Sequence, residues 1–257
     1  MIEAAIWGGI GASMLLVGAA LAFAFDVPAM LRGLVLAFGA GALFGAVAYE
    51  LFEEAVRTSV GGWDVLIGFA SGAIVFFLGS VAIDRMGSTR SSSSGDSGDA
   101  TDGPMRLSAR RDPRTDGLSV LLGTVLDGVP ESVVLGASLL GGTGVGIPVL
   151  VAIGISNVPE GLSASEDLMA AGFTRRRIIG VWLAVVAASA VAAGLGYMAL
   201  DAAGPSLTAF VDAFAAGAIL TMLAETMVPE ANEIGGRAVG LATSLGFAVA
   251  ASLSFLA

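Results

Sequence analysis

The chain has 257 residues and a formal net charge of −10; 56 % of its residues are hydrophobic and only 13 % are charged. Soluble domains carry about 25 % charged residues, so this composition excludes an ordinary soluble protein and predicts a membrane protein. The sequence contains no cysteine and no histidine, which excludes disulfides, thiolate ligands and the commonest metal ligand. No phosphate loop or nucleophile elbow occurs, and we therefore expect no enzymatic activity.

Eight apolar stretches follow one another along the chain, and each is close to the ~20 residues that a membrane helix needs. They cover residues 4–24, 33–55, 64–83, 118–142, 146–170, 178–200, 206–229 and 237–257. The expected fold is an all-α, polytopic bundle of eight transmembrane helices. Its one membrane domain comprises residues 1–84 (helices one to three) and 117–257 (helices four to eight). Residues 85–116 are rich in Ser, Gly, Asp and Arg, and this composition predicts a disordered loop.

The basic residues predict the orientation of the bundle in the membrane. All twelve are arginines, and eleven of them fall in the connections after the first, third, fifth and seventh apolar stretches. By the positive-inside rule these connections are cytoplasmic, so we expect both termini outside the cell membrane. An acidic composition without lysine further predicts a halophilic host, because high salt screens the repulsion between carboxylates.

Three prolines inside apolar stretches are each followed directly by a glutamate. The pairs are Pro130-Glu131, Pro159-Glu160 and Pro229-Glu230. A proline in a membrane helix leaves one backbone carbonyl without its partner and predicts a kink, here in the fourth and fifth helices. A carboxylate at mid-bilayer costs about 2.5–3.5 kcal/mol on insertion scales. A helix that contains both an unpaired carbonyl and a buried carboxylate needs a ligand to offset the cost. A metal cation is the ligand that fits carboxylates.

The first two pairs belong to a repeated motif that concentrates oxygen ligands. The sequence LDGVPES at 126–132 is echoed twenty-nine residues later by ISNVPEG at 155–161. Asp127 lies four residues before Glu131, so the two share a helical face about 6 Å apart along the axis. Ser156 and Glu160 have the same spacing. Two antiparallel helices that carry these groups, with the amide of Asn157, would form an oxygen-rich cage for a divalent cation.

The doubled motif resembles that of the ZIP (Zrt/Irt-like protein) family of metal transporters, in its prokaryotic form. The eight stretches, the long connection after the third, the sequence AAGF at 170–173 before basic residues and AETMVPE at 224–230 resemble the same family. The resemblance implies a multi-pass plasma-membrane protein that imports a divalent metal (zinc, manganese or iron(II)) by alternating access. The expected partners are the metal and the lipid bilayer, with no nucleic acid and no cofactor. A homodimer is compatible with the family, although the sequence does not indicate one.

The resemblance also implies which residues bind the metal. Asp127, Glu131, Ser156 and Glu160 would form a first metal position. A second position would share Glu131 and Glu160 and add Asn157.

Departures from the family pattern bear on the choice of metal. Asp127 replaces the motif's histidine, Gly128 replaces its asparagine and Ser132 its glycine. Ser189 falls where many members place a glutamate. We therefore expect the second position to be weakened or absent. The first position becomes all oxygen, which favours harder ions such as manganese, iron(II) or magnesium, while zinc stays a candidate.

Further acids inside apolar stretches predict a path for the cation. Glu50 and Asp212 would lie toward the outer side and Glu225 toward the inner side, where negative charge raises the local cation concentration. Two other functions stay open from the sequence. One is a cation/proton exchanger or channel of another family, and the other is a membrane metal sensor that binds metal without transporting it.

Overall fold

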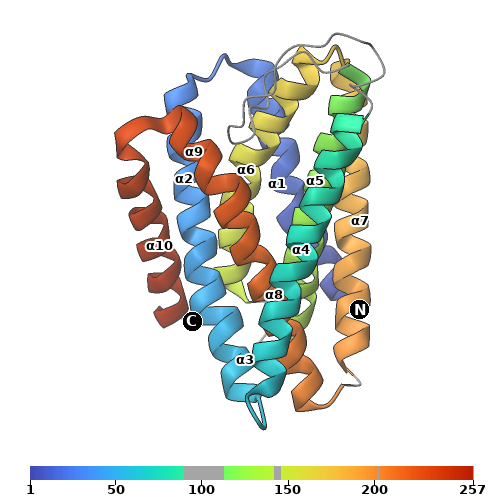
Figure 1. Cartoon of the computed structure of the whole chain (residues 1–257), viewed down its shortest axis with the longest axis vertical. Helices are drawn as coiled ribbons and strands as arrows, with labels where there is room; N and C mark the ends of the chain where they lie inside the picture. Colours follow the sequence, from blue (N-terminus) through green and yellow to red (C-terminus); the bar gives the residue numbers. More distant parts are fainter. Residues whose placement is uncertain (90–112, 142–145, 202, 257) are drawn as a thin grey trace.

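The structure is a computed structural model that describes residues 1–89, 113–141, 146–201 and 203–256 (Figure 1). Every regular element in these segments is a helix, which confirms the all-α prediction. Residues 90–112, most of the predicted disordered loop, lie outside the described residues. The helix before them extends to Thr89, and the helix after them begins at Pro113.

Several of the long helices are built from consecutive segments. The elements are α1 (Ile2–Ala24), α2 (Ala29–Ala46) with η1 (Val47–Phe52) and α3 (Glu53–Thr58), α4 (Trp63–Thr89), α5 (Pro113–Ala137) with η3 (Ser138–Gly141), α6 (Ile147–Ala170), α7 (Arg175–Asp201), α8 (Pro205–Met222) with η4 (Leu223–Met227) and α9 (Val228–Gly235), η5 (Gly236–Ala238) and α10 (Val239–Leu256). Both η1 and η4 are π-helical.

Within the described residues, seven helical stretches are long and apolar enough to cross a membrane, judged by length and composition. The last of them, Pro205–Leu256, is 52 residues long. The chain reverses direction within this stretch at Gly236, whose φ of 68° favours glycine, so that α10 returns along the bundle beside α2 (Figure 1). This is the architecture of a multi-pass membrane protein.

Many large apolar side chains lie on the outside of the bundle, whereas the inside combines some large side chains with many small ones. Leu66 on α4, Leu195 on α7 and Leu241 on α10 are 58 %, 60 % and 72 % exposed. The interior is rich in alanine instead, with Ala37 and Ala216 fully buried. An apolar exterior of this kind suits contact with lipid, and small interior residues let helices approach closely.

Glycines mark the closest helix contacts. A Cβ atom added at Gly41 of α2 would lie 1.9 Å from the carbonyl oxygen of Thr243 on α10, and one at Gly217 of α8 would lie 2.1 Å from that of Phe69 on α4. On α6, a Cβ atom at Gly161 would lie 2.3 Å from the carbonyl oxygen of Leu15 on α1. These three helix pairs therefore need glycine at the crossing.

Two helix–loop–helix units repeat at a separation of 176 residues. Helices α2 and α8 are both 18 residues long, begin at residues 29 and 205, and each continues into a π-helical segment. The partner helices α4 and α10 begin at residues 63 and 239. Helix α2 packs against α10, and α8 packs against α4. Because α2 and α8 run in opposite directions (Figure 1), the two units form an inverted repeat.

The helices that carry the repeated motif each contact both of these units. Helix α5 contacts α4 and α8, whereas α6 contacts α2 and α10. Both motif helices continue through their prolines, Pro130 and Pro159, and the kinks predicted there stay a prediction. The third proline, Pro229, lies in the first turn of α9 directly after η4, where the missing N–H is tolerated.

Candidate metal site

A small cavity lies between α1, α5, α6 and α7. It offers about 10 Å³ to the centre of a water-sized particle, which is close to the space that one water molecule or one monatomic ion requires. Its lining residues are Gly8, Ala12, Leu15, Thr124, Gly128, Glu131, Ser132, Leu135, Ile153, Asn157, Glu160, Val185 and Ser189. None of these residues is basic, and every polar side chain among them offers oxygen. The cavity therefore has the chemistry of a cation site.

Two carboxylates face this cavity from different helices. Glu131 on α5 is only 4 % exposed, and Glu160 lies opposite it on α6. Their charges repel one another, and Asp127 repels both. Burying such a group without a counter-charge is costly, so the pair is held together at the expense of stability unless a cation or protons neutralise it.

Asn157 is oriented by a bond to the neighbouring helix. Its Nδ2 donates to the carbonyl oxygen of Gly11 on α1 at 3.0 Å. The amide oxygen is then the atom that Asn157 can offer inside the cavity, three residues before Glu160 on the same face of α6.

The other two predicted ligands do not line the cavity. Ser156 is 1 % exposed, donates its Oγ to the carbonyl oxygen of Ile153 at 2.9 Å, and lies against Gly39 of α2. Asp127 is partly buried one turn before Glu131, close to the cavity but outside its wall. In this conformation, the described residues contain no group of three His, Cys, Asp or Glu side chains that could hold a metal ion. A metal here would need neutral oxygens, or Asp127 turned inward, beside Glu131 and Glu160.

Three of the residues that depart from the ZIP pattern, Gly128, Ser132 and Ser189, line the cavity. Ser189 of α7 is 5 % exposed and lines the cavity, and a Cβ atom at Gly128 would lie 3.7 Å from its Oγ. The two positions therefore face one another across the α5–α7 contact. Ser132 is buried too, and its Oγ donates to the carbonyl oxygen of Gly128 at 2.6 Å.

The three predicted pathway acids lie away from this cavity. Glu50 and Glu225 occupy η1 and η4, and π-helical segments of this kind frequently mark functional sites. The carboxylate of Glu225 accepts a hydrogen bond from Ser80 of α4 at 3.1 Å. Asp212 of α8 is 8 % exposed and close enough to Glu54 for their charges to repel.

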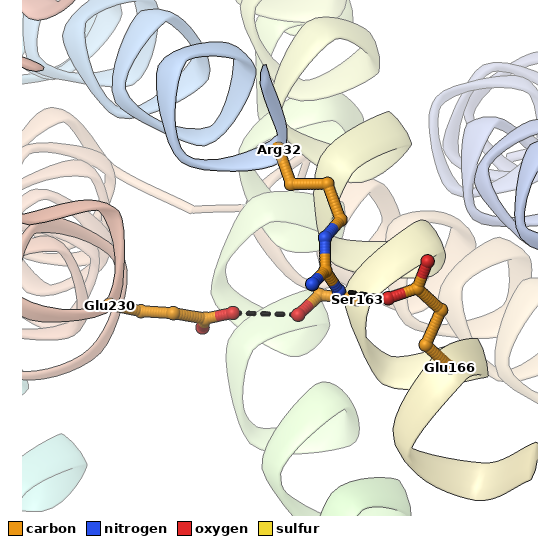
Figure 2. Close-up of polar contacts among 4 residues, drawn as sticks. All are labelled: Arg32, Ser163, Glu166 and Glu230. Carbon is orange, nitrogen blue, oxygen red and sulfur yellow. Dashed lines mark hydrogen bonds and ion pairs between the residues drawn. The ribbon is translucent and has the colours of Figure 1, made fainter. Parts of the chain in front are cut away.

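A polar network toward the C-terminal end of α6 was not predicted from the sequence. Ser163 donates its Oγ to Glu230 of α9 at 2.7 Å, and Arg32 of α2 forms an ion pair with Glu166 (Figure 2). A signal was present in the spacing, because Ser163 lies three residues from both Glu160 and Glu166 and is therefore a neighbour of each on the surface of α6. Thr124 was missed as well, although it lies one turn before Gly128 along the cavity wall.

No protein-family model matches the chain, and no curated protein sequence matches it. The resemblance to ZIP transporters therefore rests on the motifs themselves.

Proposed function

We propose that this protein is a ZIP-like transporter that imports divalent metal cations through the plasma membrane. The observation that carries the proposal is the cavity in which Glu131 and Glu160 meet the oriented amide of Asn157 with no basic side chain in the wall. Acidic side chains buried among apolar membrane helices mark ion paths in transporters.

The oxygen-only wall supports hard cations as the substrate. Carboxylate, amide and hydroxyl oxygens suit manganese and magnesium better than they suit zinc, which binds nitrogen and sulfur as well. Manganese and iron(II) are accordingly the preferred cargo, with zinc next because carboxylates also bind it.

The inverted repeat supports transport over simple binding. Secondary transporters are often built from inverted repeats that rock against one another around a site near the middle of the bilayer. Here each motif helix contacts one helix from each copy: α5 contacts α4 of the first copy and α8 of the second, and α6 contacts α2 of the first and α10 of the second. If the reversal at Gly236 separates α10 as its own span, the chain crosses the membrane eight times. Both termini then lie on one side, outside by the arginine distribution.

Uptake into proteoliposomes tests this function directly. Purified protein should accumulate manganese with saturation, and iron(II), zinc, cobalt and magnesium added in competition should rank its preference. A pH-sensitive dye inside the vesicles reports proton movement in the same experiment. Saturable metal uptake supports the proposal. Proton flux without metal uptake would indicate an exchanger or channel of another kind, and metal binding without any flux would indicate a sensor.

A further inference from the structure

An arginine from α2 lies against the C-terminal end of α6. In the predicted orientation this end of α6 faces the cytoplasm. Arg32, near the start of α2, pairs with Glu166, and each of the two side chains is 24 % exposed (Figure 2). The Nε of Arg32 is buried without a hydrogen-bond partner among the described residues. This guanidinium is thus held partly inside the bundle by a single carboxylate.

The ion pair lies on the helix that carries Glu160, toward its C-terminal end. Along α6, Ser163 is about 4.5 Å beyond Glu160 and Glu166 about 9 Å beyond it, at 1.5 Å per residue. Ser163 is a three-residue neighbour of both Glu160 and Glu166 on the surface of α6, and so lies between them. Glu230 connects the two regions, because it accepts the hydrogen bond from Ser163 and its charge repels Glu160. Polar groups therefore follow one another from Glu160 to Ser163 and Glu230, and then to the Arg32–Glu166 pair one turn further along α6.

The opposite end of the repeat has no equivalent cation. The inverted repeat relates residue 32 of α2 to residue 208 of α8, and that residue is a threonine whose Oγ1 donates to the carbonyl oxygen of Gly204. One turn deeper on α8 lies the buried carboxyl of Asp212. At that end Arg57 of α3 pairs with Glu54 at 3.8 Å, but its side chain is 71 % exposed, so the partly buried arginine is found at the Arg32 end.

We propose that Arg32 is a resident cation that closes the cytoplasmic end of the metal path and selects for divalent ions. This inference rests on the proposed transport function. A metal that reaches Glu166 must displace a guanidinium, which binds a carboxylate with well-directed hydrogen bonds. A divalent cation carries twice the charge of the guanidinium and can compete for that carboxylate, whereas a monovalent ion has no charge advantage. Arg32 therefore acts on the release of metal and not on its binding at Glu131 and Glu160.

Accessibility labelling tests the closure without any metal. The native chain has no cysteine, so Ser163→Cys introduces a single thiol beside the network. Its reaction with a neutral, membrane-impermeant maleimide from the cytoplasmic side should be slow. Adding Arg32→Gln should speed labelling about tenfold, the effect of a modest change in opening free energy. Thr174→Cys, in the exposed connection before α7, should label at one rate with or without Arg32→Gln.

Charge reversal separates closure from a general loss of structure. Arg32→Glu and Glu166→Arg should each accelerate labelling at residue 163, and the two together should restore the slow rate. In proteoliposomes, Arg32→Gln should admit sodium or potassium that the native protein excludes. Unchanged labelling in Arg32→Gln, or fast labelling in the double reversal, would overturn the closure. Those labelling results would leave the proposed transport function intact if the native protein takes up manganese. If the native protein takes up no manganese but the variants change labelling as expected, the transport function is contradicted and the closure is not.

Discussion

The amide nitrogen of Asn157 on α6 donates to the carbonyl oxygen of Gly11 on α1 at 3.0 Å. The bond engages the N–H donor of the Asn157 side chain with α1. The amide oxygen of Asn157 is left as an acceptor for the cavity that it shares with Glu131 and Glu160. Helix α1, which carries no acid between Glu3 and its end, thereby orients the neutral predicted ligand that lines the cavity. The predictions below concern the groups around this amide.

Removing either cavity carboxylate should abolish most transport. Glu131→Gln and Glu160→Gln keep the side-chain volume but remove the charge, so manganese uptake should fall at least about tenfold. The measurement is the initial rate of uptake into proteoliposomes, with the amount of folded protein checked by size-exclusion chromatography. Glu3→Gln removes an exposed acid outside the cavity and should leave the rate unchanged. Native rates in both glutamine variants would rule out the site.

Replacing Asp127 should change the ranking of metals. The side chain lies just outside the cavity wall but close enough to repel Glu160, so a longer histidine can reach the same space. Asp127→His adds a nitrogen ligand, and competition uptake should shift toward zinc over manganese. An unchanged ranking would mean that position 127 does not face the ion. Asp127→Asn, which removes the charge without adding an imidazole nitrogen, is the matched control.

Restoring an acid on α7 should create a second metal position. Ser189 already lines the cavity beside Gly128, so Ser189→Glu places a third carboxylate within it. A buried carboxylate is unfavourable until a cation arrives, so the variant should melt at a lower temperature than the native protein without metal. Millimolar manganese should raise its melting temperature more than that of the native protein. Elemental analysis should find two metals per chain in the variant and one in the native protein; two in the native protein would contradict a weakened second position.

The contact between α1 and α6 should tolerate no side chain at its crossing. A Cβ atom at Gly161 would lie 2.3 Å from a backbone oxygen of Leu15, so Gly161→Ala must push the helices apart. Overpacking of this kind costs about 1–3 kcal/mol, and thermal unfolding in detergent should show the loss. Gly180→Ala on α7 meets nothing within 4 Å and should be neutral or slightly stabilising. Equal melting temperatures for the two variants would contradict the packing.

The sequence predicted the helical class and the two central glutamates because the physics behind them is local. Hydropathy over ~20 residues depends on the stretch itself, and a buried Pro-Glu pair is conspicuous in any apolar segment. Glu131, Glu160 and Asn157 accordingly line one cavity. The side to which Ser156 points could not be predicted, since it is determined by the close approach of Gly39 on α2.

Features that depend on distant segments were missed. The inverted repeat relates helices with little identical sequence, and it becomes apparent from matching lengths and π-helical segments at 176 residues' separation. Arg32 was interpreted only as a marker of the cytoplasmic side. Its partner Glu166 is 134 residues away, and no local pattern links the two. The cavity residue Ser189 was noticed only by comparison with the ZIP pattern, because a serine in an apolar helix carries no signal of its own.

Anomalous diffraction from crystals grown with manganese tests the central claim most directly, because it locates the ion without reference to transport. The account predicts one strong peak between α5 and α6, within bonding distance of the carboxylates of Glu131 and Glu160 and near the amide oxygen of Asn157. The same crystals of Glu131→Gln should lack it. Manganese peaks confined to the surface, with none between these two glutamates, would contradict the account.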